Sequence, residues 1–162
     1  MKKIDLGQSI AILANICVIV GIIVLVLELR QNSSILQATT RETVRLADLA
    51  LINSAIENPD LWLNLMNPDM TDREKVQLSA YLISVVRQYE LAWFQYRNEA
   101  LDERAWLSNQ AGIADILSYS ESRKWWQTFS ESDFDPEFAA FVDRVLENEP
   151  IRTAITDVRA FD

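Results

Sequence analysis

The stretch IAILANICVIVGIIVLVL, residues 10–27, decides what kind of chain this is. It holds 18 residues, none of them charged, and Asn15 is its one strongly polar side chain. An α-helix rises about 1.5 Å per residue, so this stretch is about 27 Å long, close to the roughly 30 Å of a bilayer hydrocarbon core. The sequence therefore predicts a single transmembrane anchor within residues 1–30, with the lipid bilayer as its first partner.

Two other interpretations of this stretch are rejected. Lys2 and Lys3 resemble the basic start of a secretory signal peptide, but the apolar run is longer than a typical signal core and no small-residue cleavage site follows it. A lipoprotein would need a small residue before Cys17, and Ile16 stands there. We therefore expect an uncleaved anchor.

The side of the membrane is weakly encoded, because Lys and Arg residues near the two ends of the span are almost balanced. Lys2 and Lys3 precede the span, and Arg30, Arg41 and Arg45 follow it. We expect the rest of the chain to lie on the cytoplasmic side, although the balance is close.

Composition limits what the remainder can do. About 130 residues follow the anchor, which is enough for one domain but not for two. The formal net charge is −9, and this excess of acid argues against a nucleic-acid partner, because phosphate binding needs clustered Lys and Arg. The single cysteine excludes an intramolecular disulfide.

After the anchor the patterns predict helices and no strand, so the expected fold class is all-α. The anchor helix should continue as an amphipathic helix over residues 31–57, until Asn58-Pro59 stops it. Its apolar stripe is predicted to include Ile52 and Ile56. Residues 58–150 should then form a compact helical bundle, and residues 151–162 an acidic tail.

Three helix starts within the bundle have specific signatures. Thr71 is followed three residues later by Glu74, which is a capping box. Asp102 is expected to cap a second helix. Asp135-Pro136 predicts a third, with proline at the first helical position.

Several motifs occur together along the chain. The apolar helix runs directly into LELRQN at residues 27–32, a Tyr- and Trp-rich helix ends in YRNEALD at residues 96–102, and DPEF lies at residues 135–138. In this combination the chain resembles a widespread family of uncharacterised bacterial single-pass membrane proteins. The resemblance covers most of the chain and implies a bacterial inner-membrane location, but it brings no catalytic residue and no cofactor. Family members often carry their basic residues after the span, and Lys2 and Lys3 depart from that.

The sequence offers little for catalysis. It contains no histidine, which excludes zinc sites with His ligands and His-based triads. The one thiol, Cys17, lies inside the apolar run, where a thiolate is disfavoured. Glu90 and Arg97 remain as a candidate pair, and their ordinary interpretation is an ion pair or surface charge. We expect no enzyme, no cofactor and no metal.

The anchor carries the sharper functional prediction, because its small residues share one helical face. Small residues let membrane helices approach closely, and a seven-residue repeat predicts left-handed packing. Gln8 and Asn15 flank this face and could hydrogen-bond between helices. We expect parallel self-association, although small residues are common in any membrane helix. The predicted packing face consists of Gly7, Ala11, Ala14, Asn15, Val18, Gly21, Leu25 and Glu28.

Two alternatives stay open. Several copies in a ring would make a small channel, lined by Gln8, Asn15 and Glu28 and gated by Ile19 or Ile22. A membrane-tethered enzyme would instead need a closed pocket around the candidate carboxylate and arginine of the aromatic helix.

The segment Arg123-Lys124-Trp125-Trp126 has two interpretations. Basic and aromatic residues together suit a headgroup or partner interface. Tryptophan rings more commonly pack in a core. We expect Trp93 and at least one tryptophan of the pair in the core, and the other facing the membrane or a partner. The sequence thus predicts a protein that acts by assembly, as a homo-oligomer or as an accessory subunit of a membrane complex.

Overall fold

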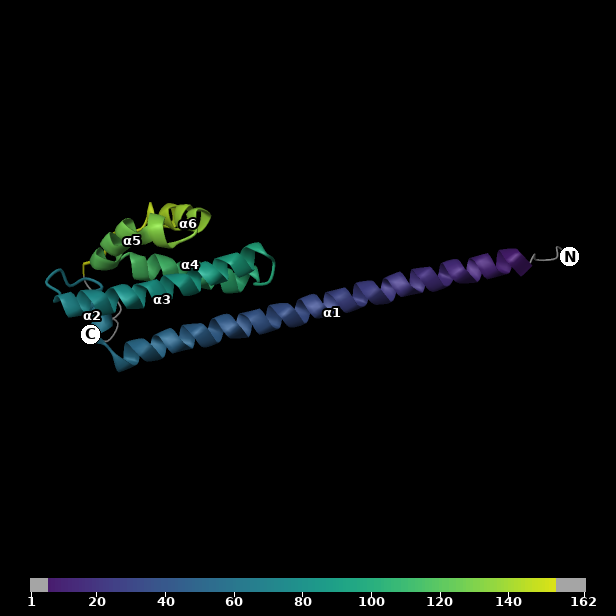
Figure 1. The fold of residues 1–162 in the computed structure, drawn as a ribbon, viewed down its shortest axis with the longest axis horizontal. Helices are drawn as coiled ribbons and strands as arrows, with labels where there is room; N and C mark the ends of the chain where they lie inside the picture. The colour runs from purple at the N-terminus through teal and green to yellow at the C-terminus, as the bar shows by residue number, and fades with distance from the viewer. Residues whose placement is uncertain (1–5, 154–162) are drawn as a thin grey trace. The chain divides into compact units, whose positions relative to one another are not determined.

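A computed structural model of the chain describes residues 6–153 and has the predicted all-α fold (Figure 1). Lys2, Lys3 and most of the predicted acidic tail lie outside the described residues, as do the side chains of Leu6 and Gln8. Within residues 6–153 the only strand-like pairing is an isolated bridge between Tyr119 and Arg152. The helices are α1 (Leu6–Glu57), α2 (Asp60–Asn64), α3 (Asp72–Arg97), α4 (Glu103–Leu117), α5 (Ser120–Asp133) and α6 (Pro136–Leu146).

α1 is uninterrupted from Leu6 to Glu57, so the anchor helix continues well beyond the apolar run, as predicted. No glycine or proline occurs between residues 22 and 58 to break it. It ends before Pro59, and Asn58 covers the last turn by donating to the Ser54 carbonyl oxygen from its backbone nitrogen at 3.0 Å and from Nδ2 at 3.3 Å.

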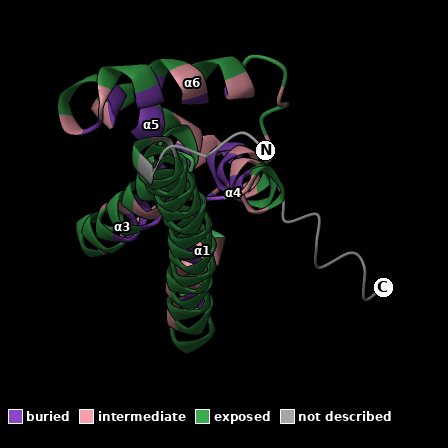
Figure 2. Ribbon diagram, turned by 90° about the vertical axis from the view of Figure 1, so that its right-hand side faces the viewer, coloured by how far each residue is buried: buried purple, intermediate pink, exposed green. Residues whose placement is uncertain are grey.

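The chain divides into two compact units, Met1–Thr39 and Thr40–Asp162. The division falls inside α1, beyond the predicted end of the anchor at residue 30. In the first unit, every described side chain from residue 9 to residue 39 is exposed. Figure 2 shows this part of α1 in the colour of exposed residues, whereas α3 to α6 carry buried positions.

The second unit holds the hydrophobic core. α1 contributes its last turns, from which Val44 and Ala55 are buried. The predicted stripe was too wide: Ile52 is 52% exposed and Ile56 is 71% exposed, because only a narrow side of α1 packs on the bundle. Aromatic rings fill the centre of the core. They are Tyr81, Trp93, Trp106, Tyr119, Trp125, Trp126, Phe134 and Phe138.

The predicted caps are confirmed. Thr71 Oγ1 accepts from Glu74 N at 3.4 Å while Glu74 Oε2 accepts from Thr71 N at 2.7 Å, which completes the capping box. Asp102 Oδ1 accepts from Ala105 N at 3.0 Å. At the third start, Asp135 Oδ1 accepts from Glu137 N at 2.9 Å, and proline is the first residue of α6. Each cap satisfies backbone donors that the first helical turn leaves without partners.

Candidate functional site

The predicted packing face lies on α1 within the first unit. All eight of its residues are exposed in the chain. A β-carbon added to Gly21 would meet no atom within 4 Å, so nothing in the same chain accounts for the glycine. The face is therefore available along its whole length for contact with lipid or with another helix.

The expected core position of at least one tryptophan of the pair is confirmed, and the expected outward position of the other is wrong, because Trp125 and Trp126 are both buried, at 8% and 1% exposure. Trp125 Nε1 donates to Ser79 Oγ of α3 at 2.9 Å, and Trp126 Nε1 donates to Asp143 Oδ1 of α6 at 2.8 Å. Successive helical residues point about 100° apart. Trp125 points from α5 toward α3 and Trp126 points toward α6, so both adjacent tryptophans pack in the core.

Arg123 also serves the fold. Its Nε donates to the Leu117 carbonyl oxygen at 2.7 Å, and its Nη1 donates to that of Leu146 at 3.3 Å. These carbonyls lie at the ends of α4 and α6, where the carbonyls of the last turn have no donor within the helix, and that of Leu146 also accepts from Glu149 N at 3.2 Å. Burial lowers the pKa of Arg123. Of the four residues, Lys124 alone is exposed, and it pairs with Glu121 at 2.7 Å.

Glu90 and Arg97 do not form a site together. Glu90 is buried, accepts from Asp135 N at 2.7 Å and pairs with Arg87 at 2.7 Å, so its carboxylate joins α3 to the start of α6. Arg97 pairs with Glu137, and its guanidinium lies 4.7 Å from the centre of the Trp93 ring. Both charges have partners in separate structural contacts.

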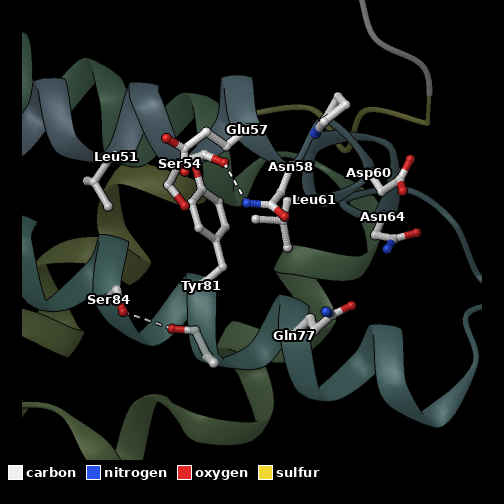
Figure 3. A pocket seen from close by; sticks show the side chains of 12 residues that line it. Leu51, Ser54, Glu57, Asn58, Asp60, Leu61, Asn64, Gln77, Tyr81 and Ser84 are labelled. Atoms are coloured by element: carbon white, nitrogen blue, oxygen red, sulfur yellow. Dashed lines mark hydrogen bonds between the residues drawn. The ribbon is translucent and has the colours of Figure 1, made fainter.

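A cleft with a volume of about 510 Å³ lies among the end of α1, α2 and α3 (Figure 3). Its polar groups include the Glu57 and Asp60 carboxylates. The Asn58 amide and the Ser84 hydroxyl instead donate to carbonyl oxygens one turn back, at 3.3 and 3.0 Å. Two of the polar side chains of this cleft are therefore already used by the helices that carry them.

A smaller cavity of about 240 Å³ lies among the last turns of α1, α3 and α4. Asp48 of α1 lines it, and burial raises the pKa of this carboxyl. Tyr89 of α3 also lines it, with a pKa raised by burial and by the nearby carboxylates of Asp48 and Asp115. Asn109 of α4 completes this polar group, and its Oδ1 is buried without a hydrogen-bond partner. We call this space the Asp48 cavity.

The sequence contained a signal for this cavity that the helical patterns alone did not reveal. Asp48 lies near the buried side of α1 marked by Val44, and Asn109 lies on the buried side of α4 marked by Trp106 and Ile113. A polar residue inside an apolar stripe predicts a satisfied hydrogen bond or a site. Only the tertiary structure shows that these two polar residues line the same cavity.

No group of three or more acidic or thiol side chains that could hold a metal ion occurs within residues 6–153. No family model, curated protein or solved structure matches this chain. The fold therefore defines its class: an all-α protein in which one described helix, α1, is long and apolar enough to be a candidate membrane span.

Proposed function

We propose that this protein is a single-pass protein of the bacterial inner membrane that acts by assembly, through parallel pairing of α1 between copies. The observation that carries the proposal is the exposure of α1 over its whole apolar run, on every side of the helix. An apolar helix of this length is stable where lipid tails or other helices surround it. The difference in side-chain size between the two faces of the helix then indicates which side meets lipid and which side meets a partner.

The two faces of the span differ in bulk. The side opposite the packing face carries Leu13, Ile16, Val20, Ile23 and Leu27, which suit lipid. The packing face carries Ala14 and Gly21, which would let two backbones approach closely. Asn15 lies beside it, and a hydrogen bond between helices would offset the cost of this amide in the membrane by about 0.6–2 kcal/mol.

The last turns of α1 support the same pairing. Val44 and Ala55 face the core of the second unit, while Leu49 and Ile56 are exposed. In the sequence, Leu49 and Ile56 lie on the seven-residue step of Ala14, Gly21 and Ile35, and Glu28 and Glu42 occupy the positions between them. A repeat of seven over many turns is the pattern of a left-handed coiled coil, so a stalk next to the membrane would extend the contact.

Native mass spectrometry of the full-length protein in nanodiscs tests the proposal. We expect one defined homo-oligomer, and we expect Gly21→Ile to weaken it at least tenfold. Val20→Phe adds comparable bulk on the opposite face and should leave it intact. A monomer in the unaltered protein, or equal effects of both variants, would contradict self-association.

Two other outcomes would each favour an alternative to this proposal. Copurification of a monomer with unrelated membrane proteins would favour the alternative in which the protein is an accessory subunit of a membrane complex. A ring of copies that passes ions across liposomes would favour the channel. The proposal includes no catalysis, since Glu90 and Arg97 are held in separate ion pairs.

A further inference from the structure

The Asp48 cavity contains a carboxylate that has no counterion among residues 6–153. Asp48 is partly buried, and it forms no ion pair with any residue that the structure describes. The other acid of the cavity, Asp115, differs because it pairs with Arg152. No lysine or arginine lines the space. A partly desolvated and unpaired carboxylate is costly to the folded chain, so a bound cation would stabilise it.

The cavity also contains a buried acceptor without a donor. Asn109 is 6% exposed, and its Nδ2 donates to the Ala105 carbonyl oxygen at 2.9 Å. This bond settles the orientation of the amide, because a flipped amide would set Oδ1 against that carbonyl oxygen. Oδ1 is therefore turned away from Ala105 and has no partner. Oδ1 has almost no accessible surface, so it is an unsatisfied polar atom in the wall of the cavity, and a ligand reaches it only if the Asn109 side chain turns.

The remaining wall is aromatic. Trp62 of α2 and Tyr81 and Tyr89 of α3 line the cavity together with Leu51 and Val85. Aromatic rings attract organic cations through their negative faces. They do not coordinate Ca²⁺ or Mg²⁺, which require six or more oxygen ligands. The wall thus favours an organic cation over a metal ion.

We propose that the Asp48 cavity binds a small primary ammonium compound, with the ammonium group donating to the Asp48 carboxylate and its carbon chain against the aromatic wall. The volume of about 240 Å³ is below the roughly 300–1,000 Å³ of ordinary ligand pockets, so the ligand is a compact amine. A quaternary ammonium has the charge but no hydrogen to donate. This site lies within the second unit and does not depend on the proposed assembly.

The test is a titration of the full-length protein in zwitterionic nanodiscs with n-butylammonium chloride, in which saturation-transfer NMR measures binding. We expect saturable binding of one equivalent. Tetramethylammonium, which keeps the charge without a donor, and butanol, which keeps a donor without the charge, should each bind at least tenfold more weakly. Empty nanodiscs measure partitioning into lipid.

Asp48→Asn is the decisive variant, because it keeps the shape of the side chain and removes the charge. It should weaken butylammonium binding at least tenfold. The matched control is Asp69→Asn, which makes the same change in net charge at an exposed position outside the cavity. Absence of saturable binding, unchanged binding to Asp48→Asn, or equal binding of tetramethylammonium would overturn the proposal.

Discussion

The ring of Tyr89 on α3 occupies the space where Gly112 on α4 would carry a side chain. A β-carbon on Gly112 would lie 3.0 Å from Tyr89 Cζ and closer still to the hydroxyl oxygen. The backbone of Gly112 is not in the left-handed region, so space and not conformation requires the glycine. This contact brings α3 and α4 together at the edge of the Asp48 cavity.

Gly112→Ala should therefore destabilise the protein by about 1–3 kcal/mol, since the rigid tyrosine ring must move. Gly→Ala inside a helix ordinarily stabilises by roughly 0.5–1 kcal/mol, so the sign of the change is informative. Urea unfolding in detergent, followed by circular dichroism, measures it. Ala111→Gly, at the exposed neighbouring position of α4, is the control and measures the ordinary difference between the two residues in this helix. Combining Gly112→Ala with Tyr89→Phe should recover part of the loss, and strictly additive effects would count against the contact.

Trp126→Phe should cost about 1–3 kcal/mol, through lost packing and through loss of the bond to Asp143. Lys124→Ala, at the exposed position of the same helix, should cost less than about 1 kcal/mol, as is usual for exposed ion pairs. The free energy of unfolding of each variant, compared with that of the unaltered protein, measures these two costs. A negligible cost at Trp126 would mean that its ring is free to meet a membrane or a partner instead.

Glu99 is the one described non-glycine residue with a positive φ, at 59°. It follows the end of α3, where Ala100 N donates to the Gln95 carbonyl oxygen at 2.9 Å and Glu99 N donates to that of Tyr96 at 3.0 Å. This is a Schellman motif, in which glycine is usual at the left-handed position. Glu99→Gly should raise stability by about 0.5–1.5 kcal/mol in thermal or urea unfolding. A loss of stability would show that the glutamate side chain matters more than its backbone strain.

The stability of the protein should depend on pH through Asp48. Burial raises the pKa of this carboxyl above its ordinary value of 3.8. A group that holds its proton more tightly in the folded state stabilises that state most below the unfolded pKa, and the contribution is lost as pH rises through the folded pKa. Asp48→Asn cannot ionise and avoids this loss. Its stability relative to the unaltered protein should therefore increase from about pH 4 toward neutral pH.

Unfolding curves of both proteins at several pH values provide the measurement. Asp69→Asn is again the control, and its difference from the unaltered protein should stay nearly constant over that range. A parallel pH dependence for Asp48→Asn and the unaltered protein would argue that Asp48 is well solvated.

Local signals in the sequence predicted the helices well. These signals act through neighbouring atoms. The apolar run lies within α1, α1 stops before Asn58-Pro59, and helices start at the capping box of Thr71 and at Asp135-Pro136. The two wrong predictions concerned which side chains of a helix are buried. Ile56 was placed in the core stripe and one tryptophan of the pair outside the core, because periodicity identifies an apolar side of a helix but not the width of what packs against it.

The sequence by itself therefore determined the all-α class, the candidate membrane helix and its continuation, because composition, helix period and cap chemistry act over a few residues. Tertiary structure alone decided which apolar residues are buried, why Gly112 must be glycine, and that Asp48 and Asn109 line one cavity. Those relations join residues far apart in the chain, and they arise only when side chains of different helices compete for the same volume.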